Sequence, residues 1–366
     1  MKNPAEAHVD LSAIKENISF IKQSVDVDLM AVVKADAYGH GLVPCAKAAL
    51  DAGATWLGVA LLEEALTLRG AGITAPILAW LVPPGSDFAR AIENDIDLAV
   101  PSIKSFNEIR SATKNKRSRI HIEVDTGMTR GGFLDEWDEF LTSDFSEVNV
   151  IGIFSHFARA DEPGNIQNQK QLENFETAIR DLSAVGINPP VVHLSNSAAT
   201  MKDPASRFTL VRIGIAMYGL SPDIDSLGSP HSLGLRPAME LRAKLHLVKQ
   251  VPAGAPVGYG ATAITHRATV LGIVAMGYAD GIPRVSQEVG IFHGKERAPI
   301  IGRVSMDQFV VDLGPDSKAQ SGDEVIVFGA GAEGEFTADD WGKSSGSINY
   351  EIVTRIGPRV HRIYGL

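Results

Sequence analysis

Cysteine is almost absent from this sequence: Cys45 is the only one in 366 residues. A single cysteine excludes a disulfide within the chain and a metal centre built from thiolates, and it is typical of a reducing compartment. No apolar run approaches the length of a membrane-spanning helix, and the first ten residues lack the apolar core of a signal peptide. We therefore expect a cytoplasmic protein with no membrane partner.

An excess of basic charge is also missing. The chain has 34 Lys and Arg against 44 Asp and Glu, a net charge of −10, which disfavours nucleic acid as a partner. The ten histidines show neither the H-x-x-x-H nor the H-E-x-x-H spacing of a metal site. We therefore expect no metal, and the composition by itself names no substrate.

The first two thirds of the chain alternate short apolar runs with amphipathic segments of helical period. The runs predict eight strands: Leu29–Val33, Trp56–Ala60, Ile77–Trp80, Leu98–Val100, Ile120–Val124, Val150–Phe154, Val191–Leu194 and Leu210–Ile215. The clearest helical segments between them are Val43–Ala52, Glu63–Ala71, Ile103–Thr113 and Gln169–Val185.

Eight strands with intervening helices predict an α/β fold of the (β/α)8 TIM-like barrel type. A doubly wound sheet is the alternative, but it has fewer strands and needs a glycine-rich phosphate loop after the first strand, which is missing here. The segment after the seventh strand is the weakest helix, so this count depends on it most.

The pattern changes after about residue 225. The stretch Ser221–Pro230 is rich in Ser, Pro, Gly and Asp and is typical of a linker. Short strand-like runs separated by turn residues then predict a mostly-β domain: Leu241–Val248, Thr269–Met276, Ala298–Ile301, Phe309–Asp312 and Glu324–Phe328. We place the barrel at residues 1–228 and the β domain at residues 229–366, with the first ten or so residues packing with the second domain.

Polar residues follow several predicted barrel strands, at the end where barrel enzymes build their sites. They are Lys34, Arg130, His156 and Ser197, and Arg212 lies within the eighth predicted strand. A solvated surface lysine is the commonest kind, but Lys34 directly follows a buried apolar run, where desolvation would make its amine nucleophilic. Such a lysine indicates a Schiff base, with a carbonyl substrate or with pyridoxal phosphate.

A glycine motif in the second domain suggests a different site. The segment Gly329–Gly334 matches G-x-G-x-x-G, with Glu351 about twenty residues on. A dinucleotide site also needs a long crossover helix, whereas only the short segment Thr337–Gly342 is available. We therefore favour a surface turn.

Nine segments in order along the chain resemble alanine racemases. The segment after the first strand, Ala31-Val-Val-Lys34-Ala-Asp-Ala-Tyr38-Gly-His-Gly, is similar to the pyridoxal-phosphate lysine motif of that family. The other matches begin at Val124, Ser155, His193, Val211, Gly258, Gly277, Ile301 and Ile348. Each motif alone is moderately specific, but the resemblance covers both predicted domains.

The resemblance implies an enzyme that interconverts L-alanine and D-alanine with pyridoxal 5'-phosphate and supplies D-alanine for the cell wall. It implies a homodimer with shared active sites, in which Lys34 carries the cofactor as an aldimine and Tyr259 of the other subunit is the second base. The remaining implied site residues are Tyr38, Ser197, Gly214, Ile215 and Tyr350 for the phosphate, Arg212 for the pyridine nitrogen, His156 as support for Arg212, and Arg130 and Met306 for the substrate.

Two residues bear on the chemistry within this resemblance. Arg212 stays protonated, so it would leave the pyridine nitrogen neutral, which favours racemisation over transamination. Glu123 stands where many alanine racemases have a carbamylated lysine. Our hypothesis is that its carboxylate orients Arg130, the alternative being an unrelated salt bridge.

Three other functions remain open from the sequence. A racemase of serine or of broader specificity would share the same site. A barrel-type decarboxylase that uses the same cofactor is disfavoured, because that group places an acid where Arg212 stands. A non-enzymatic carrier of the cofactor resembles the barrel alone, so the second domain with Tyr259 and Met306 argues against it.

Overall fold

The computed structural model describes residues 1–113, 116–286 and 288–365. The chain forms two compact units. One comprises residues 14–37 and 42–235, and the other comprises residues 1–13, 38–41 and 236–366. The boundary predicted between residues 228 and 229 stays a prediction.

The first unit contains an eight-stranded parallel sheet with the strand order β8-β7-β6-β5-β4-β3-β2-β9. Its strands are β2 (Asp28–Val32), β3 (Trp56–Val59), β4 (Ile77–Ala79), β5 (Ile96–Val100), β6 (Ser118–Glu123), β7 (Val148–Phe154), β8 (Val191–His193) and β9 (Leu210–Ile213). The backbone N–H groups of Thr209 and Arg212 donate to the carbonyls of Val192 (3.1 Å) and Ser195 (3.0 Å), which closes the sheet between β9 and β8. The predicted (β/α)8 TIM-like barrel is confirmed, with all eight strands close to their predicted positions.

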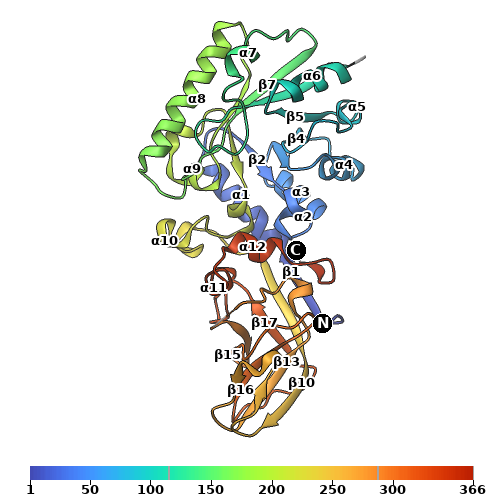
Figure 1. Ribbon diagram of the computed structural model, residues 1–366, viewed down its shortest axis with the longest axis vertical. Coiled ribbons are helices and arrows are strands. Elements are labelled where there is room, and N and C mark those ends of the chain that lie inside the picture. The colour runs from blue at the N-terminus through green and yellow to red at the C-terminus, as the bar shows by residue number, and fades with distance from the viewer. Residues whose placement is uncertain (114–115, 287, 366) are drawn as a thin grey trace. The chain divides into compact units, whose positions relative to one another are not determined.

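The helices of this unit lie outside the strands, as α4, α5 and α8 show in Figure 1. They are α1 (Leu11–Gln23, whose first three residues belong to the second unit), α3 (Leu42–Asp51), α4 (Leu62–Gly70), α5 (Phe88–Glu93), α6 (Ile103–Ala112), α7 (Trp137–Phe140), α8 (Ile166–Ala184), α9 (Ser197–Lys202) and α10 (Ile224–Leu227). The stretch predicted as a linker therefore contains a short helix, α10, in which Asp223 accepts a hydrogen bond from the N–H of Ser226.

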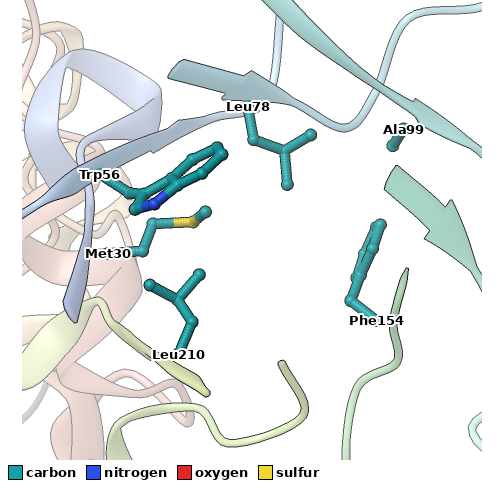
Figure 2. Close-up of a cluster of buried hydrophobic side chains, with 6 residues drawn as sticks. All are labelled: Met30, Trp56, Leu78, Ala99, Phe154 and Leu210. Carbon is teal, nitrogen blue, oxygen red and sulfur yellow. The ribbon is translucent and has the colours of Figure 1, made fainter. Parts of the chain in front are cut away.

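The barrel interior is filled by side chains from six of its strands. Figure 2 shows them as one buried cluster: Met30, Trp56, Leu78, Ala99, Phe154 and Leu210. Both faces of these strands are buried, which explains why they are continuous apolar runs and not alternating ones.

The second unit is mostly β, as predicted. Its strands are β1 (Ala5–Asp10), β10 (Met239–Val251), β11 (Pro256–Val257), β12 (Ala263–Ile264), β13 (Thr269–Val274), β14 (Gly290–His293), β15 (Glu296–Pro299), β16 (Phe309–Gly314), β17 (Glu324–Phe328) and β18 (His361–Gly365). Strand β1 pairs antiparallel with β10 and parallel with β18, so the N-terminal residues are part of this sheet. Two short helices, α11 (Ala338–Ser344) and α12 (Asn349–Thr354), complete the unit.

Candidate active site

Lys34 lies where β2 ends and the chain turns sharply. The turn, α2 (Lys34–Tyr38), is left-handed: Ala35, Asp36, Ala37 and Tyr38 all have φ between 53° and 54°. This conformation costs a non-glycine residue roughly 1–2 kcal/mol, and such strain is typical of functional sites. The carboxylate of Glu64 accepts a hydrogen bond from the N–H of Ala35 (2.5 Å), which helps to hold the turn.

The Lys34 amine is partly buried and has no hydrogen-bond partner in the part of the chain that the structure describes. Its Nζ lies 5.9 Å from the centre of the Trp80 ring. Burial lowers the pKa of Lys34, and the nearby positive charge of Arg130 lowers it further, while Glu64 opposes the shift. A larger fraction of the Lys34 amine is therefore unprotonated and nucleophilic than in a lysine of ordinary pKa.

Arg212 is the most completely buried charge of the rim. Its guanidinium donates to the carbonyls of His193 (2.8 Å), Ser155 (2.8 Å) and Leu194 (3.0 Å) through Nη1 and Nη2. Burial lowers the pKa of Arg212 to about 10, and the group stays charged at neutral pH. Its Nε donates to none of the described residues, so this N–H remains available for a ligand.

His156 follows β7 and supports Arg212. Its Nδ1 lies 3.1 Å from Nη2 of Arg212. Burial, followed by the positive charges of Arg212, Arg130 and Lys34, holds the pKa of His156 well below its ordinary value. The ring is therefore neutral, with Nδ1 as the acceptor and the proton on Nε2.

Ser197, Gly214 and Ile215 come together where β8 and β9 end. Ser197 is the first residue of α9, and its Oγ accepts hydrogen bonds from the N–H groups of Gly214 (3.0 Å) and Ala216 (3.4 Å). Ile215 begins the 3-10 turn that follows Gly214. A buried hydroxyl among backbone N–H groups suits an anionic group.

Arg130 is exposed, at the end of the loop after β6. The side chain of Asp125 fixes this loop by accepting hydrogen bonds from the N–H groups of Gly127, Met128 and Thr129 (2.9, 3.1 and 3.0 Å). Arg130 and His156 line one small cavity together with Glu123.

Glu123 makes no hydrogen bond or ion pair with Arg130 among residues 1–113, 116–286 and 288–365. Burial raises the pKa of the Glu123 carboxyl, while the charges of Arg130 and Arg212 oppose that shift. The hypothesis that Glu123 orients Arg130 therefore rests on longer-range attraction and stays a prediction.

The remaining predicted residues belong to the second unit. The rings of Tyr38 and Tyr350 have centres 6.2 Å apart, and burial raises the pKa of Tyr38. Tyr259 and Met306 are 71% and 53% exposed.

Sequence reasoning missed three buried polar residues in the barrel: Asp97, His121 and His193. Each interrupts a short apolar stretch, between Ile96 and Leu98, between Ile120 and Ile122, and between Val192 and Leu194, respectively. That interruption was the signal that could have found them, because a buried polar group needs a partner.

The part of the chain that the structure describes lacks two features. No group of three His, Cys, Asp or Glu residues could hold a metal ion. No helix there is long and apolar enough to cross a membrane.

The barrel and its rim of Lys34, His156 and Arg212 define the chain as a barrel enzyme with an additional β unit. Residues 9–222 match the family model "Alanine racemase, N-terminal domain", and residues 238–364 match "Alanine racemase, C-terminal domain". The chain therefore belongs to the alanine racemase family, and it is an isomerase of the racemase type.

Relatives and solved structures agree with the family models. The alanine racemase of Salinispora arenicola is 48% identical, with 98% of each chain covered. That of Thermobifida fusca is 48% identical, with 100% of this chain and 99% of the relative covered. The alanine racemase structure from D-cycloserine-producing Streptomyces lavendulae has a TM-score of 0.97 at 45% identity, with 100% of this chain and 98% of that chain covered. The structure from Bacillus anthracis with bound L-Ala-P has a TM-score of 0.92 at 39% identity, with 100% and 96% covered.

Proposed function

We propose that the chain interconverts L-alanine and D-alanine, with pyridoxal 5'-phosphate as its cofactor. The observation that carries this proposal is the Lys34 amine: it is partly buried, has a lowered pKa and makes no hydrogen bond with the described residues. An ordinary structural lysine at this depth would have a carboxylate partner.

The rim residues fit the chemistry of this cofactor. Lys34 would hold its aldehyde carbon, and the free Nε–H of Arg212 would face its ring nitrogen. Ser197 would offer its hydroxyl and Ile215 its backbone N–H to the phosphate, and the N–H of Gly214, which donates to Ser197 Oγ in this structure, lies beside them. Tyr38 and Tyr350 are the candidates from the second unit for the same group.

When bound, the cofactor withdraws electrons from the substrate Cα, which makes its proton removable. Arg212 limits this effect, because a guanidinium cannot accept a proton from the ring or give one up readily. His156 supports this arrangement as a neutral acceptor from Arg212. This residue set favours return of the proton to Cα over side reactions.

Racemisation requires proton transfer on both faces of Cα, and two bases suit it better than one. We assign one face to the Lys34 amine and the other to the Tyr259 hydroxyl. Arg130 would bind the substrate carboxylate, and Met306 would contribute its backbone to the substrate site. The cation of Arg130 beside Lys34 also keeps part of the lysine unprotonated.

We further propose that the enzyme is a homodimer in which Tyr259 and Met306 complete the site of the partner subunit. Both side chains are exposed in a single copy, so a partner subunit can reach them. The cytoplasm as its location, and a supply of D-alanine for peptidoglycan as its role, belong to the same proposal.

Alanine is favoured over serine as the substrate because the relatives at up to 48% identity are alanine racemases. The test is purified protein with added cofactor, incubated separately with L-alanine and L-serine and followed by chiral chromatography. D-alanine as the main product is expected. If D-serine formed faster than D-alanine, the assignment of alanine as the substrate would be wrong. If no amino acid in a panel were racemised, the proposed function would be wrong.

Tyr259→Phe separates a racemase from a carrier of the cofactor. The variant should bind the cofactor normally but lose racemisation by roughly 10²–10⁴-fold, the usual contribution of a general base. An undiminished rate would remove Tyr259 from the mechanism.

A further inference from the structure

A chain of polar side chains crosses the barrel core behind Arg212. His193 on β8, His121 on β6 and Asp97 on β5 are all fully buried. None of these side chains belongs to the proposed cofactor or substrate contacts. Buried polar groups in an apolar barrel need a reason, because each must find a partner at that depth.

The distances link these residues into one series. Nη1 of Arg212 lies 3.2 Å from Nδ1 of His193. Nε2 of His193 lies 2.9 Å from Nδ1 of His121, and Nε2 of His121 lies 3.3 Å from Oδ2 of Asp97.

The two ends of the series fix the direction in which its hydrogen bonds are donated. Arginine only donates, so Nδ1 of His193 must accept and its proton sits on Nε2. That proton is donated to Nδ1 of His121, which therefore carries its own proton on Nε2 and donates it to the carboxylate of Asp97. Each ring is thus held neutral in a single tautomer.

The charges at the two ends agree with this direction. Burial, followed by the positive charge of Arg212, holds the pKa of His193 well below its ordinary value, so this ring is uncharged. Burial alone would raise the pKa of Asp97, but hydrogen bonds from His121 and Arg119 hold it below its ordinary value. Arg119 makes two of these bonds, of 2.6 and 3.0 Å. The series cannot serve as a proton relay, because it ends on a guanidinium that does not release its proton.

The surrounding core holds both rings in place. Trp56 packs edge-on against His121 with ring centres 5.3 Å apart, and Phe154 stacks on His193 at 5.0 Å. Figure 2 shows Trp56 and Phe154 on opposite sides of the buried cluster. Gly152 leaves room for His121, because a Cβ at that position would lie 2.2 Å from its Nδ1.

We infer that His193, His121 and Asp97 are positioning residues, which hold the Arg212 guanidinium in the orientation that presents its Nε to the cofactor. This inference rests on the proposed function for the role of Arg212. The carboxylate of Asp97 acts across the barrel through two neutral rings. The series keeps Nδ1 of His193 unprotonated, so that this atom always accepts a hydrogen bond from Arg212 on the side away from the cofactor.

The first test needs no cofactor. NMR of the cofactor-free protein labelled with ¹⁵N-histidine reports which ring nitrogen carries the proton. His121 and His193 should each show a protonated Nε2 and a bare Nδ1 around neutral pH, with no second tautomer. A protonated Nδ1 on His193 would overturn the inference.

The second test breaks the series at its middle. His121→Leu removes both ring nitrogens, and Gly152→Ala displaces the ring without removing it. Both should shift the visible absorption of the bound cofactor and lower kcat about tenfold, a usual loss for a residue that positions a functional group, while KM for alanine stays within about twofold. His121→Asn, whose Oδ1 can take the place of Nδ1, should recover part of the loss.

Ile153→Ala is the matched control. Ile153 follows Gly152 on β7, is fully buried and points to the other face of the strand. It should destabilise the protein and leave the absorption and kcat unchanged. If His121→Leu and Gly152→Ala behave like this control, the inference fails while the proposed function stands. If the unaltered protein binds no cofactor, the proposed function fails, and the NMR result still decides whether the series exists.

Discussion

Nη2 of Arg212 lies 3.1 Å from Nδ1 of His156, and this contact fixes the protonation of both groups. Because the arginine can only donate, the histidine must accept, and it stays neutral. The same relation holds between Arg212 and His193 on the other side of the guanidinium. A buried cation held between two neutral imidazoles has consequences for stability and for catalysis.

Stability should fall in mild acid. The pKa values of His156 and His193 lie well below 6.5 in the folded protein, whereas an unfolded chain protonates histidine near that value. Below about pH 6.5 the unfolded state binds protons that the folded state does not. The free energy of unfolding should therefore drop by about 1.4 kcal/mol per pH unit for each ring.

Urea unfolding of the cofactor-free protein at several pH values between about 7.5 and 5.5 measures this slope. His193→Gln should reduce the slope of the free energy of unfolding against pH by the contribution of one histidine. This reduction is expected even if the substitution also changes the stability itself. A stability that does not change over this range would show that the two rings are not buried and neutral.

Arg212→Leu should cost stability even without the cofactor. The substitution leaves the carbonyls of Ser155, His193 and Leu194 without their donor. Hydrogen bonds to a charged group contribute about 1.5–3 kcal/mol each, so a loss of roughly 3 kcal/mol or more is expected. Denaturant unfolding measures it, and a loss below about 1 kcal/mol would mean that water replaces the guanidinium.

Lys34→Ala should abolish racemisation while the barrel stays folded. The amine is partly buried without a hydrogen-bond partner in the described structure, so its removal breaks no hydrogen bond with the described residues. We expect kcat/KM to fall by about 10³-fold or more, because both cofactor attachment and one base are lost. Lys34→Arg is the matched variant: it keeps a positive charge but cannot form the same bond. Substantial activity in either variant would exclude the assigned role.

Glu123→Gln tests the residue that departs from the family pattern. If the carboxylate orients Arg130 through longer-range attraction, its neutral analogue should raise KM for alanine, by about tenfold for a supporting residue. Glu123→Lys restores the residue that many family members carry, and we expect it to retain more activity than Glu123→Gln. Unchanged kinetics in Glu123→Gln would leave Glu123 with a structural role only.

Much of the fold follows from the sequence because burial on both faces gives most barrel strands a short run of apolar residues. The run predicted at Leu29–Val33 and the observed β2 (Asp28–Val32) differ by one residue at each end. The glycine motif that begins at Gly329 forms a turn. Its backbone N–H groups at Gly331, Ala332 and Glu333 donate to the carboxylate of Glu335, which occupies the place of a phosphate.

Other features could not be predicted from the residues. Nothing in Ala35-Asp-Ala-Tyr indicates a left-handed turn, because these residue types disfavour it and only the surrounding contacts maintain it. His121 and His193 lie 72 residues apart in sequence, and only the fold of the barrel brings them together. The roles of the predicted site residues stay predictions that the experiments above address.

The central claim, proton transfer at Cα from both faces, is tested most directly by exchange with solvent. The purified protein is incubated with added pyridoxal 5'-phosphate and L-alanine in D2O. The two enantiomers are then separated by chiral chromatography, and their deuterium content is measured by mass spectrometry. D-alanine that carries deuterium at Cα is the expected product. Neither D-alanine nor deuterium in the recovered L-alanine, from protein that has bound its cofactor, would contradict the claim.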